Sequence, residues 1–451
     1  MRQAHTIIVN CQLSIVNCLS GVSTINNHLC TRTYKGYVMK YKQTLWTKNF
    51  TCITLATFLS AIGGEVMTLP LSLLVFEQTQ STILSSIIFI CGVLPDVLLS
   101  VLIAPFIDKG NKKRWIIGLD ILMALVYVVM GFYIANHEFQ YIMFVLLSLG
   151  LGTISVFYRL AYNAWYPNLI PVGLEQKGYA ISGTLYPLVI IVMSPVATFL
   201  YEKTSMRNLF FLVAGITLLS VLVESLIRES TNQPKLNSSG YNFSQYKQDI
   251  KEGFAYLKRE KGIRNIYTYM AITGGVSEGT TIAIQAYYQT NPLLSVTMLG
   301  FLKSAEMVGR VLSGFVQYRI NIPAKKRYGI TKLVYIVYEF SDMILLFLPY
   351  PVMLINRFIC GGLGTASATI RETAVQSYLP NHIRARVNAL FNSIFSIGGV
   401  FFQVLGGALG EVLPYRAVVL VLGTVSLAAI WIFIVIPGKE NRKVYETVKE
   451  S

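Results

Sequence analysis

The stretch APFIDKGNKKR, residues 104–114, decides the fold class because it ends one long apolar run and begins another. Residues 83–106 are almost all apolar, and so are most of residues 115–135 behind the basic cluster. About 20 apolar residues are enough to cross a bilayer, so the pattern predicts two membrane helices joined by a tight turn. The turn carries one acid and four bases, and turns of this kind stay on the cytoplasmic side of a membrane.

The composition of the whole chain supports the same class. Hydrophobic residues make up 53% of the 451 residues and charged residues only 13%, which excludes an ordinary soluble domain. A net charge of +16 would suggest a nucleic-acid partner in a soluble protein. Here the bases gather between apolar runs, where they orient a chain in the lipid bilayer, so we expect no nucleic-acid partner.

Apolar runs of spanning length recur along the chain, separated by short polar breaks. They cover residues 50–76, 83–106, 115–135, 139–163, 178–200, 209–227, 267–289, 297–318, 329–348, 352–378, 386–411 and 417–436. We therefore predict an all-α integral membrane protein with twelve transmembrane helices. Only Lys203, Arg207 and Arg416 lie in the expected external loops, which predicts a multi-pass protein of the cell membrane with both termini in the cytoplasm.

The two ends of the chain do not belong to this pattern. The tetrapeptide IVNC at residues 8–11 recurs at residues 15–18, and the segment lacks the uninterrupted apolar core of a signal peptide. We expect residues 1–38 to be a non-native leader, with Met39 as the start, or a disordered tail. Residues 438–451 are expected to form a cytoplasmic tail.

The longest polar break, residues 228–264, divides the chain into candidate halves at residues 39–227 and 265–437. After position 243 its apolar residues recur at intervals of three or four, which predicts an amphipathic helix on the cytoplasmic surface. The break is therefore interpreted as a linker with one helix of its own.

An internal repeat relates the two sides of this linker. The tetrapeptide GLGT at residues 150–153 precedes Arg159, and GLGT at residues 362–365 precedes Arg371 at the same spacing. Parallel repeats of this kind predict two pseudo-symmetric six-helix halves, related by an axis along the membrane normal.

The opening stretch resembles the loop between helices 2 and 3 of the major facilitator superfamily, Gly-x-x-x-Asp-Arg-x-Gly-Arg-Arg/Lys. Asp108 matches the acid, and Lys109, Lys112 and Lys113 match the bases. The sequences YPNLIP at 166–171 and RARVNAL at 384–390 resemble its macrolide- and drug-efflux members. The resemblance covers about residues 45–437 and implies a drug:proton antiporter that works by alternating access. The alternative for the opening stretch alone is a turn that only sets topology.

Carboxylates near the middle of apolar runs are the candidates for proton coupling and for the substrate cavity. They are Glu65, Asp96, Glu278 and Glu306. A charge at mid-depth in a bilayer is costly, so it is usually paired, exposed to a water-filled cavity or protonated. Glu65 and Glu278 each follow a Gly-Gly pair that would let another backbone approach, with no base nearby in sequence. For Glu306 the alternative is an intramembrane ion pair with Lys303 and Arg310 on one helix face.

The resemblance also implies a gate at the ends of spans 4 and 10, where Arg159 and Arg371 lie. Asp108 ends span 2 and Asp120 begins span 3, so these acids are candidates to exchange basic partners as the gate moves. Glu224 lies close to a cytoplasmic end, and we expect it to reach the membrane surface.

These features predict a secondary transporter, most simply a monomer that exports amphipathic drugs or metabolites by proton coupling. Proton-coupled uptake of a small organic solute is the alternative, and a non-transporting receptor or scaffold is the alternative from another class. Its partners would be a small-molecule substrate, protons and the lipid bilayer. The sequence holds no phosphate-binding loop of the type Gly-x-x-x-x-Gly-Lys-Ser/Thr, and no nucleophile–base constellation or metal-ligand spacing, so we expect neither an enzyme, a cofactor nor a metal.

Overall fold

The computed structural model describes residues 44–171, 173–228, 243–320 and 322–447. The chain divides into the units Met1–Thr44 and Leu45–Ser451, and all the elements below belong to the second. The predicted leader or tail at residues 1–38 lies outside the described residues. Within the described ranges the chain is helical and has no strand, which confirms the all-α prediction.

Fourteen α-helices make up the described chain, and short 3-10 or π-helical turns continue some of them. They are α3 (Lys48–Thr79), α4 (Thr82–Lys109), α5 (Lys112–Asn136), α6 (Tyr141–Trp165), α7 (Glu175–Lys203), α8 (Met206–Ser225), α9 (Phe243–Arg259), α10 (Lys261–Thr290), α11 (Val296–Arg319), α12 (Ala324–Met343), α13 (Tyr350–Tyr378), α14 (Asn381–Val412), α15 (Tyr415–Ala429) and α16 (Gly438–Tyr445). The short turns are η1 (Tyr166–Leu169), η2 (Leu345–Phe347) and the π-helical η3 (Ile430–Val435).

Seven segments of the described chain are long and apolar enough to cross a bilayer, judged by length and composition. They are Lys48–Thr79, Lys112–Asn136, Tyr141–Leu169, Glu175–Lys203, Met206–Ser225, Arg386–Val412 and Tyr415–Val435. In α4 the described stretch Thr82–Asp96 is apolar but shorter. Helices α10 to α13 are more polar because they carry charges such as Glu306, Arg310 and Arg357. The count of twelve spans is therefore not confirmed and stays a prediction.

The turn between α4 and α5 is built from residues suited to it. Asn111 is the N-cap of α5, and its side-chain oxygen accepts a hydrogen bond from the Arg114 N–H at 2.9 Å. The indole of Trp115 covers Gly110 so closely that a Cβ there would lie 2.2 Å from the indole nitrogen. Glycine followed by asparagine therefore fits this turn, because one admits the ring and the other begins the helix.

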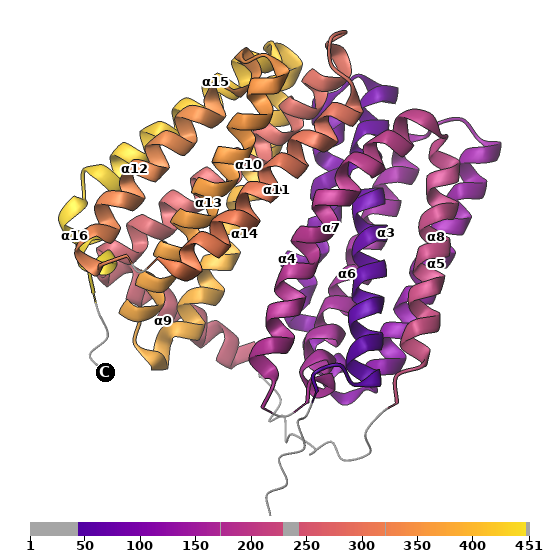
Figure 1. The fold of residues 1–451 in the computed structure, drawn as a ribbon, viewed down its shortest axis with the longest axis horizontal. Coiled ribbons are helices and arrows are strands. Elements are labelled where there is room, and N and C mark those ends of the chain that lie inside the picture. Colours follow the sequence, from indigo (N-terminus) through magenta and orange to yellow (C-terminus); the bar gives the residue numbers. More distant parts are fainter. Residues whose placement is uncertain (1–43, 172, 229–242, 321, 448–451) are drawn as a thin grey trace, which may run out of the picture. The chain divides into compact units, whose positions relative to one another are not determined.

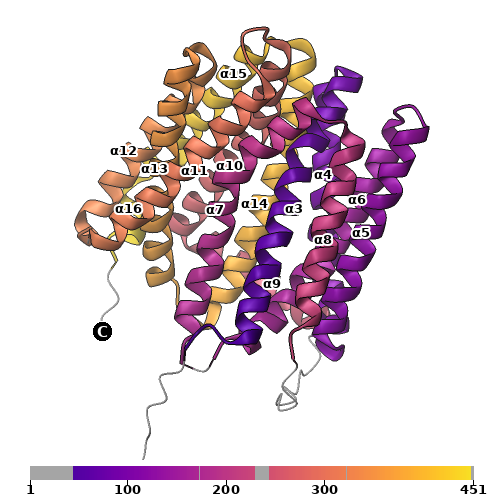
Figure 2. The same ribbon diagram turned by 45° about the vertical axis from the view of Figure 1, so that its right-hand side comes forward.

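Helix pairings follow the same scheme before and after the linker. Helix α3 packs on α7 and α8, as α10 packs on α14 and α15. Helix α4 packs on α6 as α11 packs on α13, and α5 packs on α8 as α12 packs on α15 (Figures 1 and 2). We call α3 to α8 the first helix set and α10 to α15 the second. The two helix sets meet where α7 packs on α11 and where α4 packs on α14. This agrees with the internal repeat, while the domain boundaries themselves stay a prediction.

The buried apolar clusters follow this division in part. Two clusters lie within residues 50–227 and a third within residues 257–445. A fourth joins Leu69 and Leu73 of α3 to residues 276–422. Near it, the Gln289 side-chain amide donates to the Leu73 carbonyl at 2.9 Å, so α3 and α10 are held by polar as well as apolar contacts.

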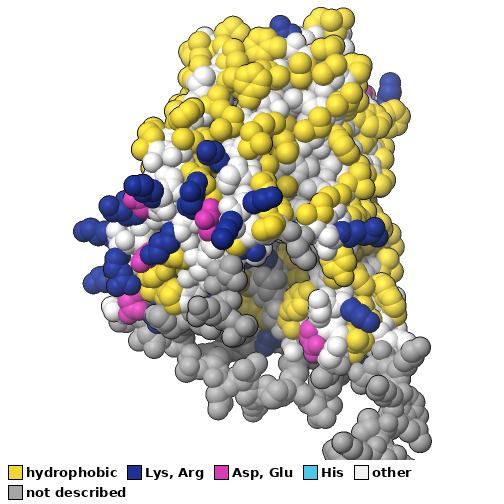
Figure 3. Space-filling view, turned by 60° about the vertical axis from the view of Figure 1, so that its left-hand side comes forward, with side chains coloured by type: hydrophobic (Ala, Val, Ile, Leu, Met, Phe, Trp, Pro, Cys, Tyr) yellow, Lys and Arg dark blue, Asp and Glu magenta, His cyan; other side chains and the backbone are white. Residues whose placement is uncertain are grey.

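Large apolar side chains remain exposed over much of the surface. Phe132 on α5, Leu222 on α8 and Trp431 beyond α15 are each more than half exposed. On the face shown in Figure 3 apolar side chains cover most of the upper part, and Lys and Arg side chains gather mainly lower down. A soluble monomer rarely exposes so much contiguous apolar surface, whereas lipid covers it in a membrane protein.

The linker ends in α9, which packs against α14. Leu257 is buried, and Glu252 forms an ion pair with Arg386 of α14. Gly253 faces the backbone of the same helix, with 3.5 Å between a built Cβ and the Arg386 carbonyl oxygen. The amphipathic helix is therefore present, with its apolar side on the bundle; its position at the cytoplasmic surface stays a prediction.

Candidate functional site

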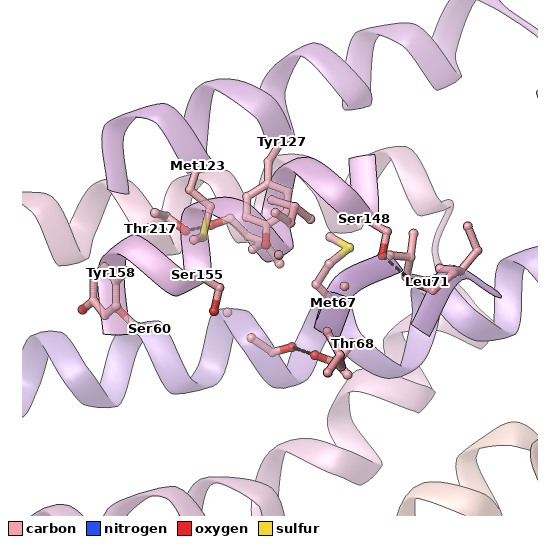
Figure 4. Close-up of a pocket in the computed structure, with 18 of the residues that line it drawn as sticks. Ser60, Met67, Thr68, Leu71, Met123, Tyr127, Ser148, Ser155, Tyr158 and Thr217 are labelled. Atoms are coloured by element: carbon pink, nitrogen blue, oxygen red, sulfur yellow. Dashed lines mark hydrogen bonds between the residues drawn. The ribbon is translucent and has the colours of Figure 1, made fainter. Parts of the chain in front are cut away.

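A cavity of about 410 Å³ lies among the helices before the linker. Its walls come from α3, α4, α5, α6 and α8, and they combine apolar side chains with hydroxyl groups (Figure 4). The labelled lining residues in Figure 4 are Ser60, Met67, Thr68, Leu71, Met123, Tyr127, Ser148, Ser155, Tyr158 and Thr217. Asp120 is the one charged residue among those that line it. An apolar cavity with a few polar groups suits a small organic ligand.

Glu65 lies at a junction of three helices. It belongs to α3 and is 1% exposed, and its Oε1 accepts hydrogen bonds from Ser194 of α7 at 2.5 Å and from Lys303 of α11 at 2.6 Å. The sequence indicated no base near Glu65 because Lys303 lies 238 positions away in the chain. The structure corrects this expectation: Glu65 is ion-paired, and the pair joins helices from both sides of the linker.

Glu278, the repeat-related carboxylate on α10, has different surroundings. Its side chain is exposed, and it has no hydrogen bond or ion pair within the described part of the chain. The expected close backbone approach holds at Gly275, where a built Cβ lies 2.5 Å from the Gly398 carbonyl oxygen. It is wrong at Gly64, where no described residue of another helix comes within 4 Å of a built Cβ. The repeat therefore preserves the position of the acid without preserving its contacts.

Glu306 belongs to a charged network between α11, α12 and α13. Arg310 Nη2 lies 2.6 Å from Glu306 Oε1, and Arg357 Nη1 lies 4.0 Å from Glu306 Oε2. Arg357 also contacts Asp342 of α12, with 2.5 Å between Nη1 and Oδ1. This corrects the expected grouping of Lys303 with Glu306 and Arg310, because the Lys303 ammonium pairs with Glu65 instead.

Asp96 and Arg159, predicted for different roles, form one ion pair. Asp96 lies on α4 and Arg159 on α6, and about half of each side chain is exposed. The repeat-related Arg371 differs, because its guanidinium lies 3.8 Å from its neighbour Glu372 and contacts the Met270 sulfur. The two arginines of the repeat therefore make different contacts.

The basic turn contributes one clear contact to the bundle. Lys113 Nζ donates to the carbonyls of Ser225 at 2.9 Å and Ile227 at 2.7 Å, so it caps the end of α8. Asp108 and Lys109 are the last two residues of α4, and Lys112 is the first of α5. The side chains of Asp108 and Lys109 are outside the described part of the structure, and the gating roles of the cluster stay predictions.

Two glutamates cap helices across the contact between the two helix sets. Glu202, at the end of α7, accepts from the Thr297 N–H at 2.9 Å and from the Thr297 hydroxyl at 2.6 Å at the start of α11. Glu411, at the end of α14, accepts from the Ile83 N–H at 3.0 Å and from the Ser81 hydroxyl at 2.7 Å at the start of α4. Carboxylates at helix starts are stabilised by unpaired N–H groups and by the helix dipole. We call these two contacts the interset caps.

The comparison with known families identifies the fold. A family model described as Major Facilitator Superfamily matches residues 53–348 and 333–450. The chain belongs to the Major Facilitator Superfamily. It is therefore a membrane-embedded transporter with a small-molecule substrate.

Relatives of this superfamily member include export proteins. Macrolide efflux protein A of Streptococcus pyogenes is 24% identical over 286 residues, which are 61% of this chain and 69% of that protein. Multidrug resistance protein MdtG of Escherichia coli O9:H4 (strain HS) is 24% identical over 399 residues, covering 85% of this chain and 92% of that protein. These names confirm the resemblance to drug-efflux members.

Solved structures of the superfamily share the fold at low identity. The nucleoside transporter NupG aligns with a TM-score of 0.63 and 12% identity, over 86% of this chain and 99% of that chain. A bacterial homolog of the human lysosomal transporter Spinster, in an inward-facing and occupied conformation, aligns with a TM-score of 0.61 and 15% identity. That alignment covers 89% of this chain and 98% of that chain.

Several contacts of this superfamily member were missed by sequence reasoning. Ser194 was not singled out from the sequence, although its hydroxyl donates to Glu65. Asp342 and Arg357 stand in apolar runs, and that signal could have marked them as a pair. Glu224 was expected to reach the membrane surface, and this is wrong because it is 0% exposed. Its burial follows from the packing of α5 on α8, which no local pattern predicts.

Proposed function

We propose that this transporter exports amphipathic drugs or metabolites by proton-coupled alternating access. The observation that carries the proposal is the buried carboxylate of Glu65, which binds Lys303 across the contact between the helix sets. A titratable group at such a contact links a proton to the relative movement of the sets. The efflux relatives support export as the direction.

The coupling step follows from the charges at this contact. A proton added to Glu65 Oε1 neutralises the carboxylate and removes its attraction for the Lys303 ammonium. Lys303 is 34% exposed and regains water when released, so the contact between α3 and α11 weakens. Loss of the proton restores the pair. Glu278 is proposed as the second coupling carboxylate, because it is exposed and unpaired within the described chain.

The remaining predicted groups have proposed roles in the same cycle. Asp96 with Arg159 is proposed to fix α4 against α6, and Glu306, which pairs with Arg310 on its own helix, is proposed to fix α11 against α13 through Arg357. Asp108 and Asp120, with the basic turn and Arg371, are proposed to act in the cytoplasmic gate. The cycle needs one chain, since both helix sets are present in it, and both termini are proposed to face the cytoplasm.

The test uses the full chain reconstituted in liposomes with an imposed pH gradient. Ethidium and a macrolide serve as amphipathic probes, and their accumulation is measured with and without the gradient. We expect Glu65→Gln to abolish gradient-driven accumulation while downhill exchange of the probe continues, because the neutral state still moves between its conformations. Glu138→Gln, an exposed loop variant, is the matched control.

Each outcome separates a different alternative. Normal accumulation by Glu65→Gln would show that Glu65 is not a coupling residue. Binding of a probe without any transport by the wild-type protein would favour a receptor or scaffold. If the probe accumulates only in the uptake direction, the proposed export is wrong and solute uptake is the function.

A further inference from the structure

Two carboxylates are buried on neighbouring helices before the linker. Asp120 of α5 is 2% exposed and Glu224 of α8 is 0% exposed. Asp120 Oδ2 and Glu224 Oε2 have no hydrogen-bond partner in the described part of the chain. Helices α5 and α8 pack on each other, and the charge of Asp120 acts on Glu224. Two buried like charges without a partner are very costly, so the site needs a positive charge.

The described side chains around the two acids do not supply that charge. Tyr158 of α6 donates to Glu224 Oε1 at 3.4 Å and is close to Asp120. Tyr162 of α6 is near Glu224, and Tyr127 of α5 is near Asp120. Helix α3 presents Ser60, whose hydroxyl lies 3.2 Å from the Ser220 hydroxyl of α8. All of these groups are neutral, so they solvate the carboxylates without balancing their charge.

Two bases near these positions in the chain are engaged elsewhere. Lys113, two turns before Asp120 on α5, donates to the carbonyls at the end of α8. Arg159, the neighbour of Tyr158, pairs with Asp96. No Lys, Arg or His of the described residues forms an ion pair with Asp120 or Glu224. The pair therefore differs from Glu65 and Glu306, which both have a basic partner.

The cavity gives a small ion a route to the pair. Asp120 lines the cavity of about 410 Å³ together with Ser60, Ser155, Tyr158 and Thr217. Figure 4 shows Tyr158 near Ser60, with Ser155 and Thr217 closer to the middle of the same group of helices. The available ligands are carboxylate and hydroxyl oxygens, which favour hard cations over soft transition metals.

We propose that Asp120 and Glu224 form a binding site for one hard monovalent cation, either a proton shared by the two carboxylates or a sodium ion. Either ion removes one unit of buried negative charge. The Tyr158 hydroxyl orients Glu224, leaving Oε2 and Asp120 Oδ2 as the oxygens that hold the cation. The site is separate from Glu65 and does not depend on the direction or proton coupling of the proposed transport.

The experiment measures ion binding to the purified full chain in detergent, so it needs no transport. The unfolding midpoint is recorded in NaCl and in choline chloride, from about pH 6 to about pH 9, and proton release on adding NaCl is followed with a pH indicator. A sodium site predicts a higher midpoint in NaCl, with proton release where the site was protonated. A proton site predicts equal midpoints in both salts and a midpoint that falls as pH rises, because loss of the shared proton leaves two buried negative charges.

The variants assign the response to the pair. Asp120→Asn and Glu224→Gln should each lose the NaCl effect or the pH dependence, since one remaining carboxylate can accept a hydrogen bond from the new amide. Tyr158→Phe keeps both acids and the ring, and it should weaken the response without abolishing it. Glu138→Gln should leave it unchanged. The proposal is overturned if the wild-type protein responds to neither ion, or if the pair variants that fold respond as the wild type does. If neither pair variant folds, an unaltered response in Tyr158→Phe overturns it.

Discussion

At the scale of single residues, the Glu65–Lys303 pair is unequally buried, with 1% of the Glu65 side chain exposed against 34% of Lys303. A buried ion pair contributes little net stability, because both ions lose hydration. Removing one partner is costly, because the other charge stays buried without compensation. The Ser194 hydroxyl solvates Glu65 only in part. The pair is therefore better suited to switching than to strengthening the fold.

A double-mutant cycle tests this asymmetry. Lys303→Met should lower the free energy of unfolding by about 3 kcal/mol, because Glu65 is then buried without its counter-charge. Adding Glu65→Gln to that variant should restore most of the loss, since no buried charge remains. Denaturation of the purified protein gives both values. Additive losses in the double variant would contradict the pairing.

The exposed pair between Asp96 and Arg159 should behave differently. Asp96→Asn should change stability by less than about 1 kcal/mol, because solvent screens half-exposed charges. We expect the same variant to slow transport, since the pair fixes α4 against α6. The exchanged pair Asp96→Arg with Arg159→Asp should recover part of the rate. If transport stays slow in the exchanged pair, the contact between these two charges does not determine the transport rate.

At the scale of helices, glycines set how closely two elements approach. A Cβ built on Gly309 of α11 lies 1.9 Å from the Phe358 carbonyl oxygen of α13, and one on Gly361 lies 1.9 Å from the Glu306 carbonyl oxygen. The two helices therefore cross in backbone contact. That crossing brings Arg357 within reach of both Glu306 and Asp342.

A pair of alanine variants on one helix tests this crossing. Gly309→Ala should destabilise the protein by about 2 kcal/mol or more, because the backbones must separate to admit a methyl group. Gly314→Ala is the matched control, since no described residue of another helix comes within 4 Å of a Cβ at that position. The control should be neutral or slightly stabilising, as alanine favours a helix. Equal midpoints in thermal unfolding of the two variants would contradict the close contact.

The periodicity of apolar residues determines which features of each helix could be predicted from the sequence. Apolar periodicity reports that a helix exists and which side is apolar, so the long helices and α9 were predicted. It does not report which neighbour a charged side chain meets. Lys303 has two possible acidic partners, Glu65 and Glu306. It pairs with Glu65 because α11 packs on α7 beside α3, and this packing cannot be predicted from the sequence of α11. The Gly-Gly pairs likewise look alike in sequence but differ in contact.

At the scale of the whole molecule, the fold class follows from composition, while the number of spans does not. Charges in α10 to α13 lower their apolar character, although the same charges form the Glu306–Arg357–Asp342 network. These charged residues lower the mean hydropathy of their helices, because a hydropathy average does not take into account that the charges pair with one another. Span counting is therefore least informative for α10 to α13, where charged side chains pair with one another between helices.

Topology is tested by labelling single cysteines in a background without other cysteines. Ala324→Cys, at the start of α12, should react with a membrane-impermeant reagent only from the cytoplasmic side, because its loop is basic. Asn136→Cys, at the end of α5, should react only from outside. Intact cells and opened cells distinguish the two. External labelling at Ala324 would reverse the proposed orientation of both termini.

The interset caps restrict how the sequence can change at these contacts during evolution. Each cap takes one hydrogen bond from a main-chain N–H, of Thr297 or of Ile83, and apart from proline no substitution removes that donor. Each helix set supplies one glutamate and one helix start. At these two contacts the residues at the helix starts can therefore change freely, apart from proline, and the caps survive as long as Glu202 and Glu411 persist.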